Sequence, residues 1–260
     1  MLQTFKNAWK VEDLRKKIIY TMIVLVIFRL GCAIPVPFIQ PSAIASMIAA
    51  DSGSMLGYLN MISGGAFANA TLFALGVTPY INSSIIITLL TVAIPYLENL
   101  SKEGEEGRKK IAKITRYIAV VIALILSLGY YFVLKRNNAL IYTEGMTGFF
   151  AAAVIITTFV AGSMLIMWMG EQIDKKGIGN GISLIIFTGI ISRLVPSATT
   201  LIAMVQVGLS GETKYLIMAP LILIFAVLVI AFAVVLNNAE RRIPIQYAKR
   251  GVARKTMGGE

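Results

Sequence analysis

Six long apolar blocks constrain the fold of this chain more than any other feature. A helix that crosses a bilayer needs roughly 20 mostly apolar residues, and 57% of the 260 residues are hydrophobic. Blocks of suitable length occupy residues 18–34, 77–97, 117–134, 149–169, 182–207 and 215–236. The pattern predicts an all-α, polytopic helical membrane protein with six spans and no soluble core domain.

Two of these blocks contain an arginine. Arg29 lies near the end of the first block, where its long side chain can snorkel to the lipid headgroups. The fifth block is longer than a span requires and contains Arg193 and Pro196. We therefore expect this block to end early or to kink.

The distribution of basic residues predicts the topology. The net charge is +11, but most of the Lys and Arg residues fall in segments that share one side of the membrane. The exceptions are Arg29, Lys135, Arg136, Arg193 and Lys214. By the positive-inside rule, the N-terminus is cytoplasmic. The expected cytoplasmic segments are 1–17, an amphipathic surface helix, and 98–116, 170–181 and 237–260, while 35–76 and 208–214 are external.

The composition excludes several kinds of chemistry. The chain has no histidine and one cysteine, Cys32, so we expect no zinc-type metal site, no internal disulfide, no catalytic residue and no cofactor. Glycines at positions 177, 179 and 181 resemble a nucleotide loop in number only, because no βαβ context surrounds them. A tight turn that caps the fifth membrane helix is the expected structure there.

Residues 56–91 contain the most informative local pattern. Residues 56–70 are split by glycines and carry polar side chains, so they are too short and too polar to span lipid. From Val77, a narrow stripe repeats at intervals of three and four residues and changes from apolar to small and polar. Two interpretations remain open: an external loop helix before an ordinary span, or a pore element. The stripe comprises Val77, Ile81, Ser84, Thr88 and Thr91.

A basic cluster after the sixth block also has two interpretations. Its charges can act as a topology signal and contact anionic lipids. Alternatively, Tyr247 among those charges suggests a docking site for RNA or protein. The cluster comprises Arg241, Arg242, Lys249 and Arg250.

Five motifs in the same order and topology resemble those of the bacterial SecY protein translocation channel family. They are FRLGCAIPVP, NMISGGAFANATLFALGVTPYINSSIIITLLT, EGEEGRKKIAKITRY, MWMGEQIDKKGIGNGISLIIF and RRIPIQYAKR. The resemblance implies a fold of ten helices in two inverted halves, of which this sequence supplies helices 1–6 and a re-entrant plug helix at 56–70. It also implies that the chain is an N-terminal portion in the bacterial plasma membrane, which needs a C-terminal half.

The resemblance further assigns residues to parts of the channel. The plug contains Asn60, Ser63, Gly64, Gly65 and Asn69. The hydrophobic pore ring receives Val77, Ile81 and Ile186 from this half, and the gate face comprises Ser84, Thr88 and Thr91. The family usually has glutamine at the position of Thr88. Docking residues for the ribosome and the motor are Arg108, Lys109, Lys110, Arg241, Arg242, Lys249 and Arg250.

The implied function is the passage of unfolded secretory chains across the membrane and the lateral release of hydrophobic segments, without enzymatic activity. The implied partners are SecE- and SecG-type small subunits, a SecA-type motor ATPase, the ribosome, signal peptides and nascent chains, and anionic lipids. The alternative is a small-solute secondary transporter, which is also built from inverted repeats and broken helices. Such a transporter would need a polar or charged site at the midplane, and these blocks carry no acidic pair.

Overall fold

A computed structural model describes residues 9–40, 44, 55–210, 213–240, 251–252 and 255–256. The chain divides into two units, Met1–Val195 and Pro196–Glu260, and each is described by itself. The first eight residues of the expected surface helix lie outside the described residues. So do four expected docking residues, namely Arg241, Arg242, Lys249 and Arg250.

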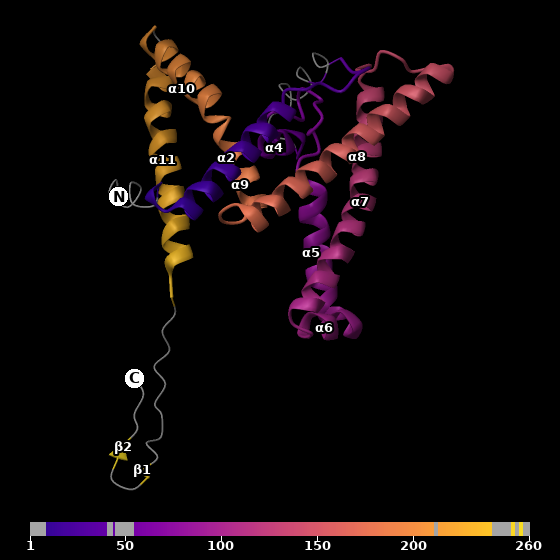
Figure 1. Cartoon of the computed structure of the whole chain (residues 1–260). Coiled ribbons are helices and arrows are strands. Elements are labelled where there is room, and N and C mark those ends of the chain that lie inside the picture. The colour runs from indigo at the N-terminus through magenta and orange to yellow at the C-terminus, as the bar shows by residue number, and fades with distance from the viewer. Residues whose placement is uncertain are drawn as a thin grey trace. The chain divides into compact units, whose positions relative to one another are not determined.

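Helices make up nearly all of the described secondary structure, as predicted (Figure 1). In the first unit the helices are α2 (Glu12–Gly31), α4 (Met55–Ile62), α5 (Thr78–Ala93), α6 (Pro95–Lys102), α7 (Glu105–Arg136), α8 (Gly145–Lys176) and α9 (Gly181–Ile191). Helix α10 (Leu194–Leu209) begins at the end of this unit, and the second unit continues with α11 (Thr213–Asn238). There, strands β1 (Gly251–Val252) and β2 (Lys255–Thr256) pair antiparallel.

Four of the described helical segments are long and apolar enough to cross a membrane: α7, α8, the run Gly181–Leu209 and Lys214–Asn238. The pair α5 and α6 gives a fifth if its two helices form one broken span. Six spans were expected, and the difference is α2. This helix carries six charged residues, so it is not apolar enough over a sufficient length to count among the candidate spans. They are Glu12, Asp13, Arg15, Lys16, Lys17 and Arg29. A membrane span at 18–34 stays a prediction.

The predicted helix at 77–97 is wrong at its C-terminal end. Helix α5 stops at Ala93, and α6 starts at Pro95 with a bend of 101° between them. Proline disfavours the helical region for the residue before it, and Ile94 is indeed extended, with φ −110° and ψ 113°. Within the unit, α5 and α7 lie side by side, with α6 at the end where they meet (Figure 1).

The segments predicted as loops at 98–116 and 170–181 are largely helical. Helix α7 begins at Glu105 and α8 continues to Lys176. Hydropathy marks only the apolar part of a helix, whereas charged turns continue it. Lys109 and Glu105 form an (i, i+4) pair at 3.5 Å, and Lys175 and Lys176 lie in the last turn of α8, where cations favour the helix dipole.

Two local features that the sequence predicted, a break in the fifth block and a capping turn before it, are confirmed. The fifth block is divided between α9 and α10 next to Arg193. The glycine-rich segment before α9 is a capping turn, in which the Asn180 side chain accepts a hydrogen bond from the Ser183 amide at 3.0 Å. Asp174 accepts another from the Gly181 amide at 2.7 Å. These bonds satisfy amides that the first turn of a helix leaves without partners.

A buried aromatic group holds the segment between α4 and α5 against α7 and α8. The rings of Phe67 and Tyr130 stack at 4.4 Å between centroids, and Tyr130 also contacts Phe159 at 5.1 Å. The Tyr130 hydroxyl donates a 2.7 Å hydrogen bond to the Phe67 carbonyl. The segment between α4 and α5, which was expected to be external, is therefore a packed part of this unit.

Candidate pore and plug site

The three expected pore-ring residues belong to one hydrophobic cluster. Val77, the residue before α5, is buried, and Ile81 lies one turn later on the same helix. Ile186 comes from α9, and both isoleucines are half-buried against the cluster. Two segments about 100 residues apart thus supply neighbouring aliphatic side chains, as a ring requires. Their position in a pore stays a prediction.

The expected gate-face residues follow Ile81 along α5. The Thr88 hydroxyl donates to the Ser84 carbonyl at 2.8 Å, and the Thr91 hydroxyl donates to the Thr88 carbonyl at 2.6 Å. Because these hydroxyls are satisfied on their own helix, the face can meet an apolar neighbour at little cost.

The expected plug is a short helix followed by turns. Helix α4 ends at Ile62, and the turns extend to Val77. Asn60 accepts a hydrogen bond from the Ala68 amide at 3.0 Å. Ser63 accepts one from the Phe67 amide at 3.1 Å, and Asn69 donates to the Gly65 carbonyl at 3.1 Å. The polar side chains of this segment therefore satisfy its own irregular backbone.

Gly64 and Gly65 bring the turn after α4 against α9. Their φ angles are +64° and +92°, a region that favours glycine. A Cβ on Gly64 would lie 3.0 Å from the Gly189 Cα and 3.0 Å from the Ser192 Oγ. A Cβ on Gly189 would lie 2.7 Å from the Ile62 carbonyl oxygen. The backbone of the turn after α4 therefore contacts the backbone of α9 directly, and there is no room for a side chain at Gly64 or Gly189.

Two arginines converge on the same turn. A Cβ on Gly64 would lie 2.9 Å from Arg29 Nη1, and one on Gly65 would lie 2.7 Å from Arg193 Nη2. Arg29 Nη1 and Arg193 Nε are buried and have no hydrogen-bond partner among the described residues. Arg29 therefore directs one guanidinium nitrogen toward this turn, and its expected reach to the headgroups stays a prediction. Both arginines stood out as charges in apolar blocks, but sequence reasoning did not bring them together.

The expected docking residues at the start of α7 are exposed. Lys109 pairs with Glu105, and Lys110 pairs with Glu103 at 3.3 Å. Arg108 is also exposed and forms no ion pair with any described residue. Surface pairs of this kind contribute about 0–1 kcal/mol each, so these cations remain available to an anionic partner.

A stronger ion pair, which sequence reasoning missed, joins α7 to α8. Arg116 Nη2 lies 2.6 Å from Glu171 Oε2, and the Glu171 side chain is only 18% exposed. Lys175 approaches the same carboxylate at 3.8 Å. Arg116 and Glu171 lie 55 positions apart in the sequence, so no local spacing could have indicated their pairing.

Among the described residues, no group of three or more His, Cys, Asp or Glu side chains could hold a metal ion. The described residues thus form a hydrophobic cluster, a broken segment packed beside it and two charged surfaces. None of these arrangements is a catalytic constellation.

The comparisons with known proteins identify the family. The family model for SecY matches residues 71–260. The protein translocase subunit SecY of Rickettsia conorii is 41% identical over 253 residues, which cover 96% of this chain and 57% of that protein. SecY of Escherichia coli K12 is 39% identical over 254 residues, covering 95% and 55%.

A solved structure shares the fold. Sec61 in the canine ribosome-channel complex from the endoplasmic reticulum matches with a TM-score of 0.53 at 19% identity, covering 89% of this chain and 49% of that one. The chain spans a little over half the length of these SecY relatives. With a family model that matches well over half of its residues, this polytopic membrane protein belongs to the SecY family.

Proposed function

We propose that this chain forms the N-terminal part of a protein-conducting channel. The channel would translocate unfolded secretory proteins and release membrane segments sideways. One observation carries the proposal: the aliphatic side chains of Val77, Ile81 and Ile186 belong to one hydrophobic cluster beside the turn that follows α4. A narrow apolar girdle can close around a passing chain and dewet when it is empty, so this arrangement suits a seal.

The turn and α4 would form the plug below that seal. A plug must leave its seat without exposing backbone groups that lack hydrogen bonds, because each such group costs several kcal/mol in hydrocarbon. Asn60, Ser63 and Asn69 bond to the backbone of their own segment. The segment would therefore keep these bonds when it moves, whereas it would lose the contacts of Gly64 and Gly65 with α9 and the stacking and hydrogen bond between Phe67 and Tyr130.

The face of α5 that carries Ser84, Thr88 and Thr91 would form one side of the lateral gate, together with α7. Signal peptides would pass between this face and the other half of the channel. The relatives extend well beyond the residues matched here, and that remaining part would supply the rest of the ring. Thr88 keeps its hydroxyl on its own helix, so it would offer the gate less polar surface than glutamine.

The partners and topology proposed here follow the family. SecE- and SecG-type subunits would complete the complex in a bacterial plasma membrane, with the N-terminus cytoplasmic. A SecA-type motor or the ribosome would dock on Arg108, Lys109 and Lys110, which are exposed, and on the basic segment at 241–250. The complex of canine Sec61 with the ribosome supports ribosome docking. No arrangement of the described residues favours a small-solute transporter.

Site-specific photocrosslinking tests the function. The chain is co-expressed with the remaining part of a SecY relative, and a photoreactive residue replaces Ile81 or Ile186. A secretory protein stalled in transit should crosslink at both positions. Trp168 on α8, which is 55% exposed, is the control position and should not crosslink. Equal crosslinking at all three positions, or none at Ile81 and Ile186, would contradict the proposal.

A further inference from the structure

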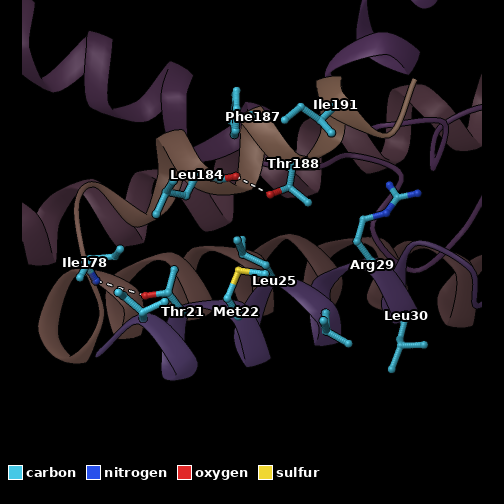
Figure 2. A pocket seen from close by; sticks show the side chains of 12 residues that line it. Thr21, Met22, Leu25, Arg29, Leu30, Ile178, Leu184, Phe187, Thr188 and Ile191 are labelled. Carbon is cyan, nitrogen blue, oxygen red and sulfur yellow. Dashed lines mark hydrogen bonds between the residues drawn. The ribbon is translucent and has the colours of Figure 1, made fainter. Parts of the chain in front are cut away.

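A buried hydroxyl on α2 holds the turn that leads into α9. The Thr21 side chain accepts a hydrogen bond from the Ile178 amide at 3.1 Å and donates one to the Lys17 carbonyl at 2.9 Å. Figure 2 shows the first of these bonds, which joins segments 157 positions apart in the sequence. Thr21 is only 4% exposed. Removal of its hydroxyl would therefore leave the Ile178 amide without an acceptor on α2.

The backbone of this turn lies close to both α2 and α8. A Cβ on Gly177 would lie 2.5 Å from Thr21 Oγ1. A Cβ on Gly181, the first residue of α9, would overlap the Gly170 carbonyl oxygen of α8 and lie 2.8 Å from the Ile173 Cβ. The start of α9 therefore has little room to shift as long as these contacts persist.

A carboxylate on α8 supports the same end of α9. Asp174 Oδ1 accepts a hydrogen bond from the Gly181 amide at 2.7 Å. The first amides of a helix have no partner within it, and an ionised acceptor makes a stronger bond than a neutral one. Asp174 and Thr21 thus fix the turn and the start of α9 to two other helices, α8 and α2.

The other end of α9 rests on the segment that is proposed to move. A Cβ on Gly189 would lie 2.7 Å from the Ile62 carbonyl oxygen, at the turn after α4. That contact would be lost when the plug leaves its seat, so it cannot hold α9 in the open channel. Ile186 lies between the two ends, about 8 Å along the helix from Gly181, and packs against the hydrophobic cluster that contains Val77. Its position thus depends on the start of the helix.

We propose that Thr21 is a positioning residue for the pore seal: together with Asp174 it fixes the start of α9 and so holds Ile186 at its place in the ring. The proposal rests on the assignment of Ile186 to that ring. An α-helix of 11 residues moves largely as one body, because hydrogen bonds join its successive turns. A shift of its first turn would therefore displace Ile186, and the seal would widen.

Distance measurements between α8 and α9 test the first step. Spin labels replace Phe150 and Ile190, which are exposed on these two helices, in the purified full chain with Cys32 changed to alanine. T21V keeps the shape of Thr21 but removes its hydroxyl, and it should lengthen and broaden the distance distribution. The displaced population should rise roughly tenfold, as expected for an amide that loses its acceptor. T21S keeps the hydroxyl and should retain the wild-type distance.

Three further substitutions separate this effect from a general loss of stability. Thr188, on α9 itself, donates to the Leu184 carbonyl of its own helix at 2.8 Å (Figure 2), so T188V is the matched control and should leave the distance unchanged. D174A should act like T21V, and D174N, which keeps an oxygen acceptor, should act like T21S. Asp174 is exposed, so its variants test the proposal even when T21V does not fold. Circular dichroism of each variant confirms that it is folded.

The resting ion conductance in planar bilayers tests the second step. Each variant is combined with the remaining part of a SecY relative. T21V and D174A should raise the conductance, whereas T21S, D174N and T188V should leave it at the wild-type level. Unchanged distances in T21V and D174A would overturn the proposal at its first step. Changed distances with wild-type conductance would overturn it through the assignment of Ile186 to the ring, so the two failures are distinguishable.

Discussion

Gly64, in the turn after α4, lies so close to Gly189 of α9 that a Cβ on Gly64 would sit 3.0 Å from the Gly189 Cα. The contact fixes the expected plug against the helix that also carries Ile186. Neither glycine can be replaced without moving a backbone, because Gly64 has φ +64° and a Cβ on Gly189 would lie 2.7 Å from the Ile62 carbonyl.

Replacing Gly189 by alanine should therefore destabilise this contact. Overpacking of this kind costs about 1–3 kcal/mol, so the thermal unfolding midpoint of the chain in detergent should fall. Gly129 in α7 is the matched control, because a Cβ there meets nothing within 4 Å. Gly129→Ala should raise the midpoint slightly, since alanine favours helix by about 1 kcal/mol over glycine. A midpoint that rises in both variants would show that the contact is loose.

Replacing Tyr130 by phenylalanine should weaken the packing of the segment between α4 and α5. The substitution leaves the buried Phe67 carbonyl without its 2.7 Å hydrogen bond, at a cost of about 1–3 kcal/mol. The measurement is the free energy of unfolding in detergent. The neighbouring Tyr131 donates no side-chain hydrogen bond to the described residues, so Tyr131→Phe should change little. Equal effects of the two variants would refute the role of the Tyr130 hydroxyl.

Reversing the charges of Arg108, Lys109 and Lys110 to glutamate should weaken the binding of ribosomes or of the motor to the reconstituted channel. The binding should also decrease as salt rises, because exposed charges are screened. Lys135→Glu with Arg136→Glu alters the opposite end of the same helix, α7, and serves as the control. If both sets of variants bind equally well, the three residues serve orientation and not docking.

Sequence patterns predicted those parts of the fold that depend on local spacing. The stripe on α5 placed Ser84, Thr88 and Thr91 on one face, and Thr88 and Thr91 bond back along their own helix. The capping turn before α9 followed from its glycines. These features depend on residues within a few positions of one another.

The features that sequence reasoning missed depend on contacts between distant segments or on a single residue inside a block. Pro95 bends the chain by 101°, although no charged residue interrupts its block. Arg116 meets Glu171 across 55 positions. Arg29 and Arg193 meet at the turn after α4 only because α2 and α9 pack beside that turn. Hydropathy reports the length of an apolar block and gives no information on which blocks touch.

The ion conductance of the reconstituted channel measures whether Ile81 and Ile186 belong to a pore seal. Ile81→Gly and Ile186→Gly are each combined with the remaining part of a SecY relative in planar bilayers. Because a seal that dewets depends on apolar width, both variants should raise the resting conductance. Ile190→Gly, an exposed position on α9, should leave it unchanged. Resting conductance that stays at the wild-type level in both ring variants would contradict the account.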